Sequence, residues 1–299
     1  MLWLSAGWHE VIGNVSQARV CIVGLGLMGG SLGMALRGRH ACRAVIGCAR
    51  KRDVCQQAVA LNAVDEATVD AVAAVRQADI VILAAPVRTI VRLVGDLGPH
   101  MQPGALLMDI GSTKASIMQA AESLPPYVQM VGGHPMCGKE RAGIAAADPD
   151  LYQGAVFCLT PLEHTRVEAL SLAGEMVRAI GARPLVVDPQ RHDALVAAIS
   201  HLPYLMATAL TTTAASVATT DQLTWQLAAS GFRDTSRLAA SDVDMMLDIL
   251  LTNCERVPAL ARQAADTLLA LAAAIENGDE TTLRAALAAA QHTRQQVYQ

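Results

Sequence analysis

Short apolar runs alternate with helical stretches between Arg19 and Asp188. The runs are rich in valine, isoleucine and leucine, and the segments between them are long enough to form helices. The candidate strands are residues 18–24, 44–49, 78–86, 105–111, 127–133, 154–161 and 182–188. Alternating strands and helices predict a mostly parallel sheet covered by helices, which is the α/β class with a doubly wound, Rossmann-type sheet.

The pattern changes after Asp188, and residues 190–299 contain no convincing strand. This second half is rich in Ala, Leu and Thr, and its helical segments are separated by helix-breaking residues. The predicted breaks lie at Pro203, Ser230-Gly231, Pro258 and Asn277-Gly278. We therefore expect an N-terminal extension over residues 1–18, an α/β domain over 19–188 and an all-α domain over 189–299.

The first helix of the second half has apolar residues near helical spacing and few charges after Asp193. These apolar residues are Leu195, Ile199, Leu202, Met206 and Leu210. A helical region with so few charges must be covered, and a second copy of the same chain often provides the cover. The all-α domain is therefore predicted to form a homodimer.

A glycine motif directly follows the first strand and opens a helix. Gly24, Gly26 and Gly29 have the G-x-G-x-x-G spacing of a dinucleotide site, in which the pyrophosphate lies at the helix N-terminus. Leu27 and Met28 stand between the glycines. Because ligands of such sheets bind at the carboxyl ends of the strands, we add Ala85, Pro86 and Asp109 to the residues expected to contact the cofactor.

The turn after the second strand is basic, with Arg50, Lys51 and Arg52, and it lacks the acidic residue that an NAD site would carry there. An arginine can pair with the 2′-phosphate of NADP. We therefore predict NADP as the cofactor, with NAD as a weaker alternative. The competing interpretation is a solvated basic turn.

Composition narrows the range of partners. The chain has 23 basic and 27 acidic side chains, a formal charge of -4 and 3% aromatics, which predicts no nucleic-acid or anionic-membrane partner. The seven cysteines form no Cys-x-x-Cys pair, so no metal and no disulfide framework is predicted, and a cytoplasmic location fits best. Apolar runs such as 78–86 are too short to span a bilayer, and residues 1–18 lack the basic leader of a signal peptide.

Two of the eight histidines are candidates for chemistry. His134 lies in GGHPMCG, where Gly133 permits unusual dihedral angles and Pro135 keeps the histidine out of the helical region. A histidine held in this way suits proton abstraction, although it could also only hydrogen-bond its loop. His201 precedes Pro203, which predicts a helix kink at a pocket wall, with a satisfied core histidine as the alternative. The other six are expected at the surface: His9, His40, His100, His164, His192 and His292.

Two further segments supply polar side chains. DIGSTK follows the fourth strand and would present Ser112 and Lys114 to the cofactor cleft. In SGFRDTSR, Arg233 and Arg237 are four residues apart and would share a helix face, where either could bind a carboxylate. The competing interpretation is a charged helix surface with Asp234 as a partner.

In this order, GLGLMGGSLG, DIGSTK, GGHPMCG, SHLP and SGFRDTSR resemble the prephenate/arogenate dehydrogenases of tyrosine biosynthesis. The resemblance implies a Rossmann domain, a helical dimerisation domain and NAD(P)-dependent oxidative decarboxylation of a cyclohexadienol. It further implies that His134 takes the proton of the ring hydroxyl, that Ser112 hydrogen-bonds this histidine and the substrate, and that His201 lines the pocket. Arg237 matches the arginine that holds a substrate carboxylate, and Arg233 falls where the family more loosely has a basic residue.

The basic turn and the short layout resemble the arogenate-using, NADP-preferring members, so arogenate is the predicted substrate. Prephenate, or both substrates in a cyclohexadienyl dehydrogenase, is the alternative. A hydroxyacid or imine dehydrogenase would share the glycine motif but would not explain GGHPMCG together with SHLP. A nucleotide sensor without turnover would need neither the base nor its serine and arginine partners. No role is predicted for Cys137 or Lys139.

Overall fold

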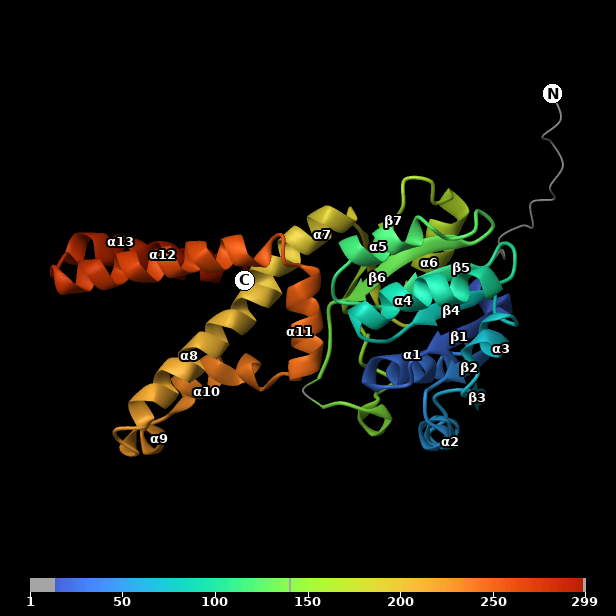
Figure 1. Ribbon diagram of the computed structural model, residues 1–299, viewed down its shortest axis with the longest axis horizontal. Coiled ribbons are helices and arrows are strands. Elements are labelled where there is room, and N and C mark those ends of the chain that lie inside the picture. Colours follow the sequence, from blue (N-terminus) through green and yellow to red (C-terminus); the bar gives the residue numbers. More distant parts are fainter. Residues whose placement is uncertain (1–13, 140, 298–299) are drawn as a thin grey trace, which may run out of the picture.

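The computed structural model describes residues 14–139 and 141–297 of the 299-residue chain. It shows an α/β domain and a helical arm that extends away from it (Figure 1). Most of the predicted N-terminal extension lies outside the described residues. Within them, Val15–Gln17 forms a short 3-10 helix, η1, and buries the side chain of Val15 against the core.

The described part of the α/β domain contains an eight-stranded sheet in the order β3-β2-β1-β4-β5-β6-β7-β8. All neighbouring strands are parallel except β6 and β7. The strands are β1 Arg19–Val23, β2 Ala44–Cys48, β3 Glu66–Thr68, β4 Ile80–Leu83, β5 Leu106–Asp109, β6 Gln129–Pro135, β7 Val156–Pro161 and β8 Arg183–Val186. The predicted doubly wound class is confirmed. The sequence pattern missed β3, because this edge strand has only three residues and none is fully buried.

Helices cover both faces of the sheet, and for this reason the central strands are apolar throughout. In β1, Val20 and Ile22 belong to one buried cluster, whereas Cys21 and Val23 belong to another on the opposite face. The first cluster includes residues of α1 and α6, and the second includes residues of α4 and α5. The helices of this domain are α1 Leu27–Gly38, α2 Arg52–Ala60, α3 Ala71–Val75, α4 Val87–Leu97, α5 Ala115–Ala121 and α6 Val167–Ala179, with 3-10 turns η2 Gly98–His100 and η3 Ile144–Ala146.

The described residues after Pro189 are helical or in turns. The elements are α7 Pro189–Val196, η4 Ala197–His201, α8 Leu202–Ala218, α9 Leu223–Gln226, α10 Ser230–Ser236, η5 Arg237–Ala240, α11 Val243–Thr252, α12 Val257–Glu276 and α13 Glu280–Val297. The predicted breaks near Ser230, Pro258 and Asn277-Gly278 coincide with helix starts or turns. The predicted break at Pro203 is wrong. Here η4 is a π-helix, and its wider turn accommodates the proline so that α7, η4 and α8 continue as one helical run.

This run, Pro189–Ala218, is long and apolar enough to cross a membrane, with a mean hydropathy of 1.5 over its most apolar window. The prediction that every apolar run is too short to span a bilayer is therefore wrong for this run. Length and composition alone are weak evidence for a membrane span, because core helices of other proteins meet the same test. Its side chains Leu195 and Ile199 are 51% and 69% exposed in the single chain, and Leu268 and Leu269 of α12 are exposed as well. The arm therefore carries apolar surface that one chain leaves uncovered.

Candidate active site

The glycine turn between β1 and α1 fits a dinucleotide. Gly24 has φ +110°, and a Cβ there would lie 2.1 Å from the Ala84 carbonyl oxygen. A Cβ on Gly29 would lie 1.9 Å from the Gly24 oxygen, so helix and strand pack closely only without one. A Cβ on Gly26 would meet nothing within 4 Å. Gly26 therefore opens space at a helix N-terminus that has no side-chain cap, as pyrophosphate binding requires.

The other residues predicted to contact the cofactor divide into two groups. Leu27 and Met28 lie half-buried in the first turn of α1, and Ala85 and Pro86 lie between β4 and α4, at the same edge of the sheet. Asp109 instead has no exposed surface. Its carboxylate accepts hydrogen bonds from the main-chain N–H of residues 111 and 133, so its predicted position facing the cofactor is wrong.

Lys114 is fully buried and forms an ion pair with Asp109. Its Nζ also donates to the Gly133 carbonyl, 2.6 Å away. The predicted orientation of this lysine toward the cleft is therefore wrong, because the carboxylate and the carbonyl direct its charge inward. The lysine fixes the end of β6 next to His134 and is not positioned to contact a substrate.

Arg50 and Lys51 are exposed and follow β2, which lies beside β1. Lys51 is the N-cap residue of α2. Because Cys48 at the end of β2 is in register with Val23 at the end of β1, the basic turn stands next to the glycine turn. This is the arrangement in which a side chain can reach the ribose of a bound dinucleotide.

His134 lies in a strand, whereas the sequence predicted a loop. It belongs to the end of β6 and is in register with Cys158 of β7. Gly133 is required by space and not by an unusual dihedral angle, because a Cβ there would lie 2.4 Å from the Asp109 carbonyl oxygen. The His134 side chain is half-buried at the carboxyl edge shared by β1, β4, β5 and β6. The base candidate and the glycine turn thus occupy one edge of the sheet.

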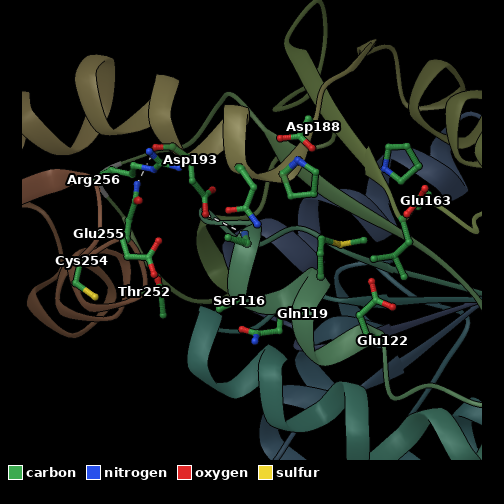
Figure 2. A pocket seen from close by; sticks show the side chains of 17 residues that line it. Ser116, Gln119, Glu122, Glu163, Asp188, Asp193, Thr252, Cys254, Glu255 and Arg256 are labelled. Carbon is green, nitrogen blue, oxygen red and sulfur yellow. Dashed lines mark hydrogen bonds between the residues drawn. The ribbon is translucent and has the colours of Figure 1, made fainter.

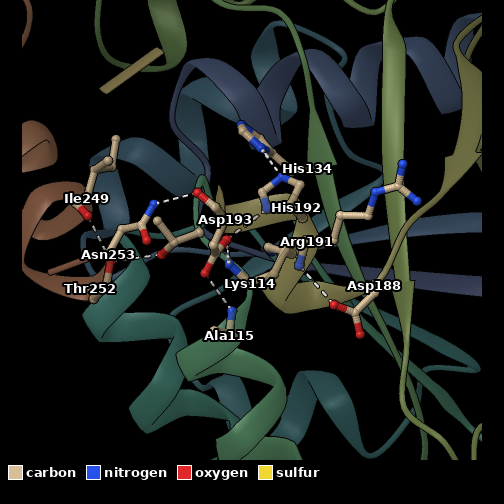
Figure 3. Close-up of polar contacts among 12 residues, drawn as sticks. Lys114, Ala115, His134, Asp188, Arg191, His192, Asp193, Ile249, Thr252 and Asn253 are labelled. Carbon is tan, nitrogen blue, oxygen red and sulfur yellow. Dashed lines mark hydrogen bonds and ion pairs between the residues drawn. The ribbon is translucent and has the colours of Figure 1, made fainter. Parts of the chain in front are cut away.

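The hydrogen-bond partner of His134 differs from the predicted one. Its Nδ1 lies 2.8 Å from Nε2 of His192, and the two rings meet edge to face (Figure 3). Among the described residues, Ser112 makes no hydrogen bond to His134. His192 is 2% exposed, so the prediction that it is a surface residue is wrong. Sequence spacing gives no signal for this pair, because α7 meets β6 only through the tertiary fold.

His201 is also buried, and it belongs to the π-helix. Nδ2 of Asn253 donates to the main-chain carbonyl of Asp193 at 2.8 Å and lies 3.2 Å from Nδ1 of His201. A carbonyl can only accept, so the Asn253 nitrogen is the donor and His201 accepts at Nδ1. Asn253 was not anticipated from the sequence.

Both histidines are neutral near pH 7. Burial, followed by electrostatic interactions with His192, Lys114 and His201, lowers the pKa of His134 well below its usual value of 6.5. Burial lowers the pKa of His201 to about 4, against the opposing effect of Asp193. A neutral imidazole has an unshared electron pair, so either ring can take up a proton.

The arginine segment is divided between two elements. Arg233 lies in α10 and its Nε is 3.2 Å from Asp234 Oδ1, with both side chains more than two thirds exposed. Arg237 begins η5, so the two arginines do not share one regular helix face as predicted. Arg237 is exposed beside α8, the helix that follows His201.

In the GGHPMCGKE segment, Lys139 pairs with Asp148 at 2.6 Å, and the pKa of Cys137 is raised to about 11 by burial.

A pocket of about 600 Å³ lies between the α/β domain and the arm (Figure 2). Its lining includes Ser116 and Gln119 of α5, Asp188 before α7, and Glu255 after α11. Asp193 also lines it and is therefore shared between this pocket and the histidine pair. The pocket lining does not include His134 or the glycine turn, so this cavity is distinct from the predicted cleft.

Comparisons with known families match both halves of the chain. The family described as "Prephenate dehydrogenase, nucleotide-binding domain" matches residues 32–186. The family described as "Prephenate dehydrogenase, dimerization domain" matches residues 188–289. The first match begins after the glycine turn, and the junction of the two lies at the start of α7.

Similar proteins carry related names. The prephenate dehydrogenase of Bacillus subtilis is 32% identical over 82% of this chain and 66% of its own length, so this chain spans just under two thirds of that relative. The structure of Synechocystis arogenate dehydrogenase is 31% identical and covers 93% of this chain and 99% of its own, with a TM-score of 0.81. The structure of the prephenate dehydrogenase from A. aeolicus, in complex with hydroxyphenyl propionate and NAD+, is 30% identical. The match covers 93% of this chain and 98% of that chain, with a TM-score of 0.86.

Proposed function

Because this chain belongs to the prephenate dehydrogenase family, we propose that it catalyses the NAD(P)-dependent oxidative decarboxylation of a cyclohexadienol to a phenol. The observation that carries the proposal is the position of His134. Its half-buried, neutral imidazole lies at the same sheet edge as the glycine turn, where a bound nicotinamide and a substrate would meet.

In this reaction the ring hydroxyl loses its proton to His134 while its carbon loses a hydride. The bound cofactor supplies the hydride acceptor. Loss of CO2 then leaves its bonding electron pair in the ring, which becomes aromatic as a phenolate. The phenolate oxygen takes the proton back from His134, which gives the phenol and restores the neutral base. The chain contributes the base and holds the reacting groups in place, and such positioning accounts for much of an enzyme's rate. Ser112 and His201 are proposed to contact the substrate, with His201 offering its Nε2–H as a donor.

The names of the similar proteins favour prephenate as the substrate, since the Bacillus subtilis relative and the A. aeolicus structure carry it. Arogenate, the substrate predicted from the sequence, is the second candidate. It is favoured by the Synechocystis arogenate dehydrogenase, which matches over almost its full length, and by the basic turn after β2.

The test is to add each substrate to the purified protein with NADP or NAD and to follow the absorbance of the reduced cofactor. We expect 4-hydroxyphenylpyruvate from prephenate or tyrosine from arogenate, and kcat/KM ranks the two. Cofactor binding by calorimetry without turnover of either substrate would contradict the proposal and favour a sensor.

We propose NADP as the preferred cofactor because Arg50 and Lys51 flank the expected ribose position. The double variant Arg50→Ser/Lys51→Ser should lower kcat/KM for NADP at least about tenfold while leaving that for NAD nearly unchanged, since only NADP carries the 2′-phosphate. Steady-state kinetics with both cofactors measures this. Arg43→Ser, an exposed arginine before β2, is the matched control. A wild-type enzyme that prefers NAD would overturn the proposal.

We propose Arg237 as the residue that binds a substrate carboxylate. Arg237→Ala should raise KM for the cyclohexadienol by about 10- to 100-fold and change kcat much less, because a charged hydrogen bond to bound substrate is lost. Arg233→Ala serves as the comparison, since Arg233 is an exposed arginine of the same segment, four residues before Arg237. Equal effects of both substitutions on KM would show that the carboxylate site is not centred on Arg237.

We also propose that residues 19–188 and 189–299 act as the cofactor and dimerisation domains of a cytoplasmic homodimer. The dimerization-domain match and the uncovered apolar side chains of α7, η4 and α12 support the dimer. Light scattering should give twice the chain mass of 31.4 kDa at micromolar concentration. A monomer would contradict the assignment.

A further inference from the structure

We propose that His192 and Asp193 are positioning residues that fix the protonation and orientation of His134 and offset the charge it gains during turnover. The inference rests on the proposed function, in which His134 is the base. Its structural basis is a hydrogen-bonded chain from His134 through His192 to Asp193 (Figure 3).

Asp193 is the fixed end of this chain. Its Oδ1 accepts the main-chain N–H of Lys114 at 2.8 Å, and its Oδ2 accepts that of Ala115 at 2.9 Å. These N–H groups open α5, so the carboxylate of α7 caps the N-terminus of a helix in the other domain. Oδ1 also lies 2.8 Å from Nδ1 of His192. Both carboxylate oxygens are thereby held in place.

The donors and acceptors determine where the protons lie. An ionised carboxylate can only accept, so His192 must donate from Nδ1 to Asp193. A neutral His192 then has an electron pair at Nε2 and accepts from its other neighbour. That neighbour is Nδ1 of His134, at 2.8 Å, which therefore carries a proton. The remaining nitrogen of His134, Nε2, is left as the site that can accept a proton.

Burial agrees with this assignment. His192 and Asp193 are each 2% exposed, whereas the His134 side chain is half-buried. Of the three side chains, His134 is therefore the most open to solvent and ligand. The second ring nitrogen of His134 lies on the side of the ring away from His192 (Figure 3), and the substrate is proposed to approach that side.

The hydrogen-bonded path from His134 to Asp193 also offsets the positive charge that His134 gains during turnover. When the substrate hydroxyl proton moves to Nε2, His134 becomes an imidazolium with protons on both nitrogens. The Nδ1 proton continues to point at His192, whose other nitrogen is bonded to the negative carboxylate of Asp193. A carboxylate that orients a histidine in this way stabilises the imidazolium without itself taking the proton. Only the substrate proton is transferred to His134, and the protons between His134, His192 and Asp193 stay on their nitrogens.

The first test removes the acceptor. His192→Leu should lower kcat roughly 100-fold, with little change in the Kd of the cofactor, because the base loses its orientation and charge compensation. His192→Gln keeps a side-chain oxygen that can accept from Nδ1 and should recover part of that loss. His164→Leu is the matched control, since that histidine is 65% exposed and should keep wild-type kcat. Unchanged kcat in His192→Leu would overturn the proposal.

The second test asks whether His192 acts through His134. In a His134→Asn background the base is already gone, so His192→Leu should cost less than about twofold more in the residual rate. Losses that multiply across the double variant would show that His192 has an independent role, and the positioning assignment would be wrong.

A third measurement needs no turnover and therefore separates this inference from the proposed function. Nitrogen-15 NMR of histidine-labelled wild-type protein at pH 7.5 should show His134 protonated at Nδ1 and unprotonated at Nε2, with His134→Asn assigning the signal. The opposite tautomer would refute the proposed hydrogen-bond path from His134 to Asp193, even if the enzyme were active. An inactive wild type with the expected tautomer would instead refute only the proposed function.

Discussion

His134→Asn should lower kcat by about two to four orders of magnitude, because that is the usual contribution of a positioned general base. The asparagine nitrogen can still donate to His192 in place of Nδ1, so the surrounding bonds are largely retained. What is lost is the electron pair at Nε2 that receives the substrate proton. Stopped-flow or steady-state assays measure the rate, and calorimetry should show an almost unchanged Kd for the cofactor.

Near-normal turnover of His134→Asn would show that the base is another group.

The wild-type pH profile provides an independent check. Because the pKa of His134 is lowered, its neutral form persists as the pH falls below 6.5, and protonation abolishes the base only at lower pH. The acidic limb of kcat/KM, which reports on the free enzyme, should therefore lie below pH 6.5. A limb above that value would contradict the assigned environment.

Lys114→Met should lower the free energy of unfolding by roughly 3–5 kcal/mol, the usual cost of leaving one charge of a buried pair without its partner. The lysine has no exposed surface, and its ammonium bonds both Asp109 and the Gly133 carbonyl. Its removal leaves the Asp109 carboxylate buried with only main-chain N–H donors. Urea unfolding followed by circular dichroism measures the change.

Two comparisons make that result specific. Lys139→Met removes an ion pair whose lysine is 40% exposed and should cost no more than about 1 kcal/mol. Lys114→Met/Asp109→Asn removes both buried charges while keeping a side-chain acceptor, and it should recover part of the lost stability. If Lys114→Met were no more destabilising than Lys139→Met, the buried pair would contribute nothing to the fold.

The sequence predicted the features that depend on neighbouring residues. The strand-turn-helix around Gly24 and Gly26 follows from local steric rules, and the helical half follows from its composition. The sequence did not predict contacts made across the fold. The polar neighbours of His192 predict a surface residue, whereas its contact with His134 spans 58 positions of the chain. The position of Lys114 after β5 predicts a side chain that faces the cleft, but its ion pair with Asp109 holds the ammonium inside the domain.

The helix cap made by Asp193 has a consequence for how the two halves of the chain can evolve and be recombined. In the proposed assignment, the proton acceptor His134 belongs to the α/β domain, but its tautomer is set by His192 and Asp193 of the arm. An α/β domain fused to the helical arm of another protein would keep its glycine turn. It would lose the contact with His192 that orients His134. A chimera of two relatives should therefore take His192 and Asp193 from the same parent as His134 and the N-terminus of α5 that Asp193 caps.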